Sequence, residues 1–366
     1  MKIKVTQEKL SKALNNVSRI AIGKVTLPIL NNVLIRVDNK KVSLVTTNLD
    51  MAIVDFLPVS SSEDGVVTVP AKLLAEFVSN LPKGETIEIS SKDTKVTIKA
   101  GKYSSTINGA LADDFPELPE IDEKTAVIYK ISTDEFKNSV GQVTIASSND
   151  LTRPALTGVF FNTNNHTLAI ASTDGYRLAE KKLINNVENE VAAIVPTSSL
   201  QEVLRSINDD MEEVEISFNE DLVRFRLGEV EIISKLIDAS FPDYQRLIPK
   251  DNNIKVNLNR EELLRVTKLA ALFARSVGGS IICETKTPDI FSVKSIANEF
   301  GENDSEIETK VNVAGKVNLN SRFLIDALNA LEEKEIEFTF SDRIAPIVLK
   351  NKKNNNYTHI IMPLNS

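Results

Sequence analysis

Two pairs of carboxylates and two histidines are the residue types in this chain that could support catalysis. Asp113-Asp114 and Asp209-Asp210 offer adjacent oxygen ligands of the kind that hard metal ions prefer, and His166 and His359 are the only histidines. A hydrolase or nuclease would have to use Asp113/Asp114 or His166/His359. Neither histidine has a flanking serine-elbow pattern, no third carboxylate joins either Asp pair, and no glycine-rich phosphate motif occurs. This enzymatic function therefore stays the alternative, and a non-catalytic interaction protein without a cofactor is favoured.

The segment STDGYRLA, Ser172 to Ala179, combines a turn signal with side chains suited to binding. Asp-Gly between two alternating apolar runs predicts a tight turn between antiparallel strands. Such a turn does not require the Tyr176, Arg177 and Leu178 that follow it. The reason for these three residues stays open at the level of the turn itself.

Basic residues recur on one face of the helices that the sequence predicts. Lys9, Lys12 and Arg19 share a stripe with Asn16 at helical spacing. Leu10, Leu14 and Val17 point the other way, toward a sheet. In a later helix Arg265, Lys268 and Arg275 are expected to lie opposite Leu263, Val266, Leu269 and Ala270. The other predicted helices each carry a cation, namely Lys72, Lys137, Arg205 or Arg322. Acidic residues on the same helices leave an ordinary solvated surface as the alternative to phosphate contact.

An internal repeat organises the chain of 366 residues. LPILNNVLIRVDNKKVSLVTTNLD, from Leu27, aligns without a gap with RPALTGVFFNTNNHTLAIASTDGY, from Arg153, at an offset of 153 − 27 = 126. A shorter period relates Val5 to Val69, and a similar one relates Leu258 to Leu319. Six strand-then-helix units result, two per repeat, so the sequence predicts three tandem domains.

Each unit is predicted to pass from a short strand through a capping residue into an amphipathic helix. The predicted caps are Thr6, Ser132, Thr197, Asn259 and Asn320. Alternating apolar runs then predict antiparallel strands, which gives an α+β fold with helices on one face of the sheets. DDFPELPEIDEK (residues 113–124) and FPDYQRLIPKDNN (residues 241–253) are the expected linkers.

Composition narrows the class of protein. The chain has 42% hydrophobic and 26% charged residues, and no apolar run approaches the length of a membrane-spanning helix. MKIKVTQEKL at the start has no signal-peptide core, and the single Cys283 agrees with a reducing compartment, so we expect a cytoplasmic protein that does not contact membranes. The net charge of −8 argues mildly against nucleic-acid binding but does not describe how charge is distributed.

These features resemble one family, the bacterial DNA polymerase III beta subunit, or DNA sliding clamp. The resemblance rests on the three repeats, MKIKVTQEKL, LPILNNVLI, the pair TNLDMAI and STDGYRLA, FPDYQRLIP and the terminal IIMPL. It implies three clamp domains, at residues 1–124, 125–250 and 251–366, in a ring-shaped homodimer that encircles duplex DNA. Helices would line the ring and antiparallel sheets would form its outside. It also implies a non-catalytic processivity factor.

The resemblance further implies three sets of site residues. A groove between the second and third domains would bind linear peptides of partners through Leu156, Thr173, Gly175, Tyr176, Arg177, Leu178, Pro242, Arg246, Leu247, Asn320, Phe323, Ile344, Pro346, Ile360, Met362 and Pro363. Arg177 and Arg246 are expected at its rim. DNA would be contacted by Lys9, Lys12, Arg19, Lys24, Lys72, Lys137, Arg153, Arg205, Arg265 and Lys268. The dimer interface would use Lys95, Lys99, Lys102, Leu272, Phe273, Glu299 and Glu302, with basic and acidic edge strands facing each other.

The implied partners are duplex DNA, bound without sequence preference, the DNA polymerase III alpha subunit and the clamp-loader ATPase. Other polymerases, ligase and mismatch-repair proteins would share the same groove. Tyr176 stands where the family often has His, Phe323 where it often has Tyr, and the chain ends in Leu364-Asn365-Ser366. We therefore expect peptide preferences that differ from those of other members.

Overall fold

The computed structural model describes residues 1–21, 27–39, 41–59, 61–249, 251–297 and 300–364. It contains two compact units. Unit 1 joins Met1–Thr133 to Ser198–Leu236, and unit 2 joins Asp134–Thr197 to Ile237–Ser366. The boundary between the units therefore runs through the middle repeat, and each unit is described by itself.

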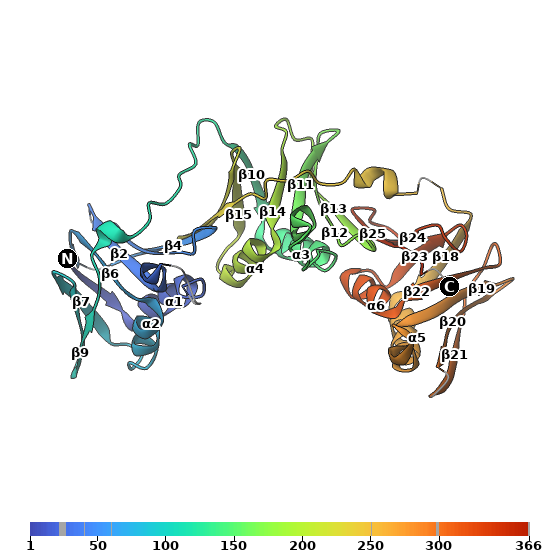
Figure 1. The fold of residues 1–366 in the computed structure, drawn as a ribbon, viewed down its shortest axis with the longest axis horizontal. Coiled ribbons are helices and arrows are strands. Elements are labelled where there is room, and N and C mark those ends of the chain that lie inside the picture. Colours follow the sequence, from blue (N-terminus) through green and yellow to red (C-terminus); the bar gives the residue numbers. More distant parts are fainter. Residues whose placement is uncertain (22–26, 40, 60, 250, 298–299, 365–366) are drawn as a thin grey trace. The chain divides into compact units, whose positions relative to one another are not determined.

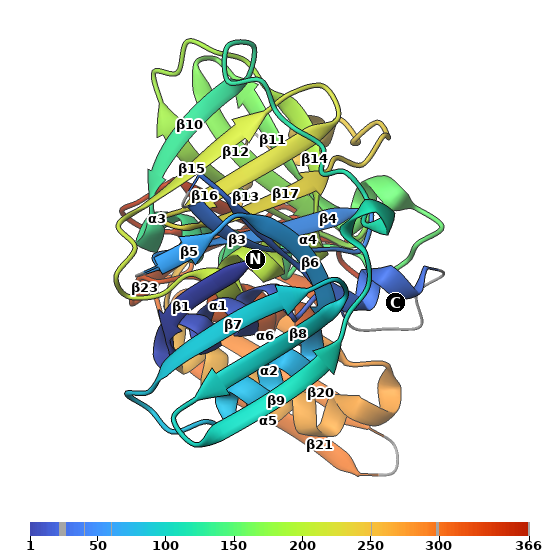
Figure 2. The same ribbon diagram turned by 90° about the vertical axis from the view of Figure 1, so that its left-hand side faces the viewer.

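Unit 1 contains a five-stranded and an eight-stranded antiparallel sheet (Figures 1 and 2). The strand order of the first is β5 (Ser61–Glu63), β1 (Lys2–Thr6), β7 (Thr86–Lys92), β8 (Lys95–Ala100), β9 (Tyr103–Asn108). The order of the second is β10 (Val127–Ser132), β15 (Glu213–Phe218), β16 (Leu222–Leu227), β17 (Val230–Lys235), β4 (Met51–Leu57), β3 (Lys41–Thr47), β2 (Asn32–Asp38), β6 (Gly65–Pro70). The second sheet thus combines strands of the first and middle repeats, joined where β4 pairs with β17.

Unit 2 contains an eight-stranded and a four-stranded antiparallel sheet. The order of the first is β14 (Ala192–Pro196), β11 (Gly158–Asn164), β12 (Thr167–Thr173), β13 (Arg177–Asn185), β25 (Tyr357–Ile361), β24 (Ile347–Asn351), β23 (Glu335–Phe340), β18 (Ile254–Asn259). The order of the second is β21 (Gly301–Glu308), β20 (Ile290–Ala297), β19 (Ser280–Lys286), β22 (Gly315–Asn320). Here the middle and third repeats share a sheet through the pairing of β13 with β25.

Six α-helices lie within the described residues, as the sequence predicts. They are α1 (Gln7–Val17), α2 (Ala71–Ser79), α3 (Thr133–Thr144), α4 (Thr197–Ser206), α5 (Arg260–Ala274) and α6 (Ser321–Ala330). In α1 the predicted core residues Leu10, Leu14 and Val17 are fully buried. In α5 the pattern holds for Leu263, but Leu269 is 45% exposed, so the prediction of a buried Leu269 is wrong.

The repeat predicted from the sequence is confirmed at the level of single elements. The 3-10 helices η1 (Pro28–Asn31) and η3 (Pro154–Thr157) keep the offset of 126 positions, as do the β2–β3 and β11–β12 hairpins that follow them. The predicted caps are confirmed in part. The side chains of Asn259 and Asn320 accept backbone N–H donors of α5 and α6, whereas Thr6 makes no capping hydrogen bond and Thr197 lies inside α4.

Both predicted linkers pack against the sheets that they cross. The first contains η2 (Ala112–Asp114) and buries Phe115 against Leu34, Val45 and Val54 of the eight-stranded sheet of unit 1. The second contains η4 (Tyr244–Leu247). Its Tyr244 is buried in a core cluster of unit 2 with Ala171, Leu178, Val348 and Ile360. Each linker thus anchors one aromatic side chain, Phe115 or Tyr244, in the core of its unit.

Candidate functional site

The turn between β12 and β13 has the hairpin geometry that Asp-Gly predicts. Oδ1 of Asp174 accepts hydrogen bonds from the backbone N–H groups of Tyr176 at 2.9 Å and Arg177 at 3.0 Å. The hydroxyl of Thr173 accepts from Gly175 N–H at 3.0 Å, and Gly175 adopts a φ of 91°. The turn leaves the Tyr176 side chain 60% exposed.

The equivalent turn in the first repeat shows that the same fold forms without Tyr-Arg. There Asn48 accepts from Asp50 and Met51, and Thr47 accepts from Leu49, whose φ is 76°. A non-glycine residue thus takes the left-handed conformation that Gly175 takes in the middle repeat. The turn geometry alone does not explain Tyr176 and Arg177.

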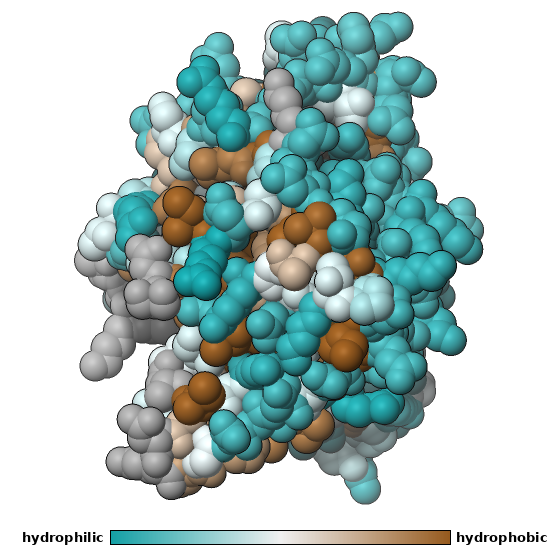
Figure 3. Space-filling view, turned by 90° about the vertical axis from the view of Figure 1, so that its right-hand side faces the viewer, coloured by the Kyte–Doolittle hydropathy of each residue, from teal (hydrophilic) through white to brown (hydrophobic). Residues whose placement is uncertain are grey.

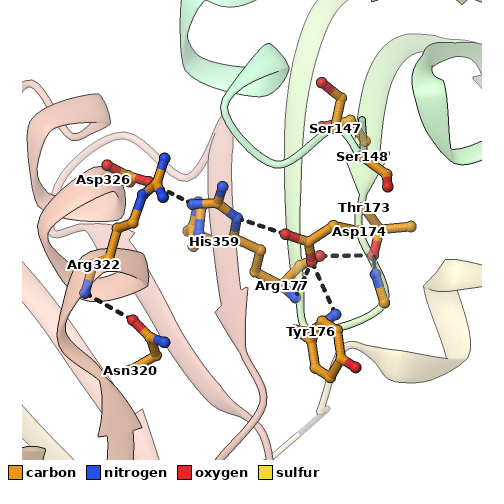
Figure 4. A network of polar contacts seen from close by, with 12 residues as sticks. Ser147, Ser148, Thr173, Asp174, Tyr176, Arg177, Asn320, Arg322, Asp326 and His359 are labelled. Atoms are coloured by element: carbon orange, nitrogen blue, oxygen red, sulfur yellow. Dashed lines mark hydrogen bonds and ion pairs between the residues drawn. The ribbon is translucent and has the colours of Figure 1, made fainter. Parts of the chain in front are cut away.

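Arg177 forms the centre of a polar network between the middle and third repeats within unit 2 (Figure 4). Its Nε donates to Oδ2 of Asp174 at 3.0 Å and its Nη1 donates to Oδ2 of Asp326 at 2.7 Å. The guanidinium also lies 4.6 Å from the ring centroid of Phe323. The side chain is only 9% exposed, so the expectation that Arg177 lies at an exposed rim is wrong.

His359 lies behind Arg177 in a fully buried position (Figure 4). Its Nδ1 is 2.8 Å from the Tyr357 hydroxyl, which also donates to the carbonyl of Gln142. Burial, and then the charge of Arg177, lower the pKa of His359 to about 3. The imidazole is therefore neutral at pH 7, and its burial keeps it from acting on a substrate at the surface.

The residues of the predicted peptide groove fall into three classes of exposure, all within unit 2. The exposed ones are Gly175, Tyr176, Pro242, Arg246, Leu247 and Ile344. The partly exposed ones are Asn320, Phe323, Pro346, Met362 and Pro363, and the buried ones are Leu156, Thr173, Arg177, Leu178 and Ile360. Among the large apolar side chains of the set, the exposed ones are Tyr176, Leu247 and Ile344. They are the ones that offer free surface to a partner. We refer to the whole set as the predicted peptide site.

The predicted DNA-contacting cations differ in their exposure and in their ion pairs with acidic side chains. Lys9, Lys137, Arg265 and Lys268 are exposed. Lys12, Lys72 and Arg153 are exposed but lie near Asp210, Glu76 and Asp150, at 4.0, 3.9 and 3.7 Å respectively. Arg19 lies beyond the end of α1 and donates to Glu202, which also pairs with Arg205. Lys24 lies outside the described residues.

The predicted dimer residues lie near two edge strands, β9 and β21, and only the acidic edge strand is the one that the sequence predicts. The acidic segment is confirmed as an edge, because β21, which carries Glu302, is the outer strand of its sheet. Lys95 and Lys99 lie on β8, and the edge beside them is β9, so the expectation of a basic edge strand is wrong (Figure 2). Lys102 lies in the turn between β8 and β9.

Apolar side chains are also exposed near the β21 edge. Leu272 is 56% exposed and Phe273 is partly buried, while Glu299 lies outside the described residues. Ile296 and Phe300 are 57% and 67% exposed and were not predicted. Figure 3 shows separate apolar patches between hydrophilic side chains on this side of the molecule.

The groups considered for catalysis are dispersed. Asp113 and Asp114 are exposed in η2, and His166 is an exposed hairpin residue whose Nδ1 is 3.2 Å from the carbonyl of Val187. Within the described part of the chain, no group of three His, Cys, Asp or Glu side chains could hold a metal ion.

Comparison with known proteins assigns all three repeats to one family. Models of the N-terminal, central and C-terminal domains of the DNA polymerase III beta subunit match residues 1–119, 130–243 and 245–365. The chain belongs to the DNA polymerase III beta subunit family. It is 29% identical to the beta sliding clamp of Staphylococcus aureus over 96% of both chains.

Solved structures of family members agree with this assignment. A sliding clamp from Bacillus subtilis is 28% identical, covering all of this chain and 99% of that one, with a TM-score of 0.94. A sliding clamp from Pseudomonas aeruginosa, solved bound to griselimycin, is 26% identical over the full length of both chains, again with a TM-score of 0.94. The predicted α+β fold of three tandem clamp domains is confirmed.

Membership of this family decides the class of function. The chain is a sliding clamp, a non-catalytic processivity factor whose partners are DNA and a polymerase. The hydrolase or nuclease alternative is not supported. No helix among the described residues is long and apolar enough to span a membrane.

Sequence reasoning missed the residues that hold Arg177. Asp174 was visible as the first residue of the Asp-Gly turn, and its spacing of three positions from Arg177 could have suggested an ion pair. Asp326 carries no such signal, because it lies on a helix 149 positions away.

Proposed function

We propose that two copies of this chain form a ring that encircles duplex DNA and tethers DNA-processing proteins through linear peptides. Each copy would contribute three domains, at residues 1–124, 125–250 and 251–366. The observation that carries this proposal is the full-length match to sliding clamps, with a TM-score of 0.94 over the whole chain. The details below rest on where this chain exposes charge, strand edges and apolar side chains.

The DNA contact would be made by the exposed cations of α1 and α5. Lys9 and Lys12 on α1, and Arg265 and Lys268 on α5, lie on the faces opposite the buried apolar residues. Side chains of this kind contact phosphates and carry no information about base sequence. Arg19 and Arg205 are less suited to this role, because both pair with Glu202.

The dimer contact would join the β9 edge of one copy to the β21 edge of the other. Both edges present unpaired backbone groups, which favour addition of a strand. Lys95, Lys99 and Lys102 flank β9, and Glu302 lies on β21, so opposite charges would meet. Two equivalent contacts of this type close a ring.

The peptide contact would use the exposed part of the predicted peptide site. Tyr176, Leu247 and Ile344 are 60%, 47% and 74% exposed, and the partly exposed Met362 offers an adaptable surface. Peptides with a Gln and a Leu-Phe pair would insert their apolar side chains here. The polymerase III alpha subunit, the clamp loader, other polymerases, ligase and mismatch-repair proteins would compete for this site.

Retention on DNA tests the ring. The chain should remain bound to nicked circular DNA after loading at high salt and should be lost when the circle is linearised. Gel filtration should give the mass of a dimer, and Leu272→Ala with Phe273→Ala should shift it to a monomer. Equal retention on circular and linear DNA, or an unaltered dimer in this variant, would contradict the ring or the contact respectively.

Fluorescence anisotropy with a labelled peptide carrying Gln and Leu-Phe tests the peptide site. Tyr176→Ala with Ile344→Glu should weaken binding at least tenfold, since both side chains are exposed and their loss leaves the core intact. Leu178 is unsuitable for this test, because it is 2% exposed and a charge there would disrupt the core cluster. Unchanged affinity in the surface variant would exclude this site.

A further inference from the structure

A large hollow lies between the first linker and the sheet that the linker crosses. Its volume is about 1040 Å³, and all of its walls belong to unit 1. Ala112 and the segment from Phe115 to Lys124 form one wall, and side chains of β2, β3, β4, β16 and β17 form the other. Figure 1 shows the linker running as an extended arc from η2 to β10. Pockets that bind ligands typically span about 300–1,000 Å³, so this hollow is large enough for a guest.

The second linker provides an internal comparison, because the repeat places it on the equivalent sheet of unit 2. There Tyr244 fills the space beside the sheet and donates from its hydroxyl to Glu180 at 2.8 Å. Phe241 stacks on Phe160 with 4.8 Å between ring centroids. The hollow left beside Tyr244 has only about 290 Å³.

The first linker keeps Phe115 at the position of Phe241 but lacks three of the groups that close the second one. At the offset of 126 positions, Leu118 stands in place of Tyr244, Val54 in place of Glu180, and Leu34 in place of Phe160. The duplicated scaffold therefore tolerates a filled space at this location. The open space of the first linker is a property of its own side chains, not a requirement of the fold.

The walls of the hollow combine apolar side chains with unpaired charge. Phe56 on the sheet and Leu118 on the linker are partly exposed, whereas Val45 and Val54 are buried in the cluster with Phe115. Glu117 and Glu120 of the linker are exposed at the hollow, and neither forms an ion pair within the described part of the chain. A guest with basic side chains would complement these carboxylates.

Arg224 supplies a second and independent sign of a guest. It lines the hollow, and its side chain is 9% exposed. Its Nη2 donates to Glu123 at 2.9 Å, but its Nε is buried and has no hydrogen-bond partner among the described residues. A buried donor without a partner costs free energy, and a backbone carbonyl of an inserted peptide would satisfy it.

We propose that this hollow is a second docking site, which takes a linear peptide carrying an apolar anchor flanked by basic side chains. The anchor would contact the partly exposed Phe56 and Leu118, the basic side chains would pair with Glu117 and Glu120, and a peptide carbonyl would accept from Arg224 Nε. The site differs in both location and charge preference from the predicted peptide site of unit 2. It does not depend on that site.

The test uses the full chain and fluorescein-labelled Gly-Lys-Leu-Lys-Phe-Lys-Gly, with a matched peptide in which Glu replaces each Lys. We expect the basic peptide to bind at least tenfold more tightly than the acidic one at 50 mM salt. Leu118→Tyr places the tyrosine of the second linker at the equivalent, partly buried position and should weaken binding of the basic peptide at least tenfold. Glu117→Lys with Glu120→Lys changes only exposed side chains and should have a similar effect.

Two controls separate loss of the site from a general effect of charge and from loss of folding. Asp113→Lys with Asp114→Lys makes the same charge change on the same linker, at residues that do not line the hollow, and should reduce affinity less than threefold. Urea unfolding of each variant reports whether unit 1, which carries all of these substitutions, remains folded. The proposal is overturned if the basic peptide does not bind. It is also overturned if the affinity for the basic peptide is the same in the unaltered chain, in the Leu118→Tyr variant (the filled variant) and in the Glu117/Glu120 variant. It is also overturned if all charge-reversal variants weaken binding equally while the filled variant does not, because the peptide then responds only to net charge.

Discussion

Nη1 of Arg177 lies 2.7 Å from Oδ2 of Asp326, and this ion pair links the β12–β13 hairpin of the middle repeat to helix α6 of the third. Asp174 holds the same guanidinium from the turn itself. Arg177 thus acts as a structural link beneath the predicted peptide site, while Tyr176 beside it is exposed. Adjacent residues of one turn therefore have different tasks.

Loss of the Arg177 side chain should destabilise unit 2. Arg177→Met leaves Asp174 and Asp326 without their partner in a partly buried setting, which costs about 1–3 kcal/mol. Urea unfolding should show this loss. Arg246→Met is the matched control, because Arg246 is 85% exposed and its one ion pair among the described residues is with Asp243. Exposed pairs contribute about 0–1 kcal/mol. Equal effects of the two substitutions would contradict the structural role of Arg177.

Asp55 should make unit 1 less stable as the pH rises from about 4 to 7. Burial raises its pKa to about 6, although Asn16 donates to it at 2.8 Å. The pKa of Asp in the unfolded chain is about 4, so at pH values between about 4 and 6 the folded chain binds the proton more tightly than the unfolded chain. The free energy of unfolding that this proton contributes decreases as the pH rises. In Asp55→Asn this dependence should disappear. Relative to the unaltered chain, the variant should therefore gain up to about 3 kcal/mol between pH 4 and 7.

Urea unfolding at several pH values measures this difference. Asp50→Asn is the matched control, since the Asp50 side chain is 86% exposed. A constant difference between Asp55→Asn and the unaltered chain across the pH range would show that Asp55 does not hold its proton in the fold.

His359 should give the opposite pH dependence in unit 2. Burial lowers its pKa to about 3, whereas an unfolded histidine titrates near about 6.5. Between these values the unfolded chain binds the extra proton, so stability is lost as the pH falls below about 6.5, by at most about 1.4 kcal/mol per pH unit. His359→Gln should flatten this loss, whereas His166→Gln, at an exposed hairpin position, should not. If both variants lose stability with falling pH as the unaltered chain does, His359 is not the source of this pH dependence.

The two equivalent turns should respond to substitution with opposite signs. Gly175 has a φ of 91°, so Gly175→Ala should cost about 1 kcal/mol. Leu49 holds a φ of 76° with a side chain in place, so Leu49→Gly should relieve strain and stabilise unit 1 by up to about 1 kcal/mol. Thermal unfolding of both variants checks this, and destabilisation by Leu49→Gly would contradict it.

The sequence predicts well those features that depend on local patterns or on the repeat. The Asp-Gly turn, the six helices and the offset of 126 positions all follow from neighbouring residues or from comparison of the chain with itself. The strand β9 is different. Its sequence YSSTIN buries only one of six side chains, so it has no alternating pattern, and Lys95 and Lys99 were therefore assigned to the edge. The hydrogen bonds of a sheet, rather than its side chains, define such a strand.

The burial of Arg177 could not be predicted for a related reason. A charged residue beside a turn is usually exposed, and only the approach of α6, far along the chain, supplies the second carboxylate. Leu269 is the opposite case, an apolar residue that is predicted to be buried but is exposed. Helical spacing alone does not distinguish the border of an apolar stripe from its centre.

The division of the middle repeat between two sheets has a consequence for the newly made chain. Asp55 of β4 pairs with Val230 of β17, and Lys181 of β13 pairs with Tyr357 of β25. As the chain leaves the ribosome, β4 keeps an open, apolar edge until β17 of the middle repeat has been synthesised, and β13 keeps one until β25 of the third repeat has been synthesised. Such contacts between distant residues form slowly, and waiting strands of this kind are sites of aggregation. A single repeat made alone would keep that open edge permanently, so the sheet of each clamp domain is complete only beside its neighbour.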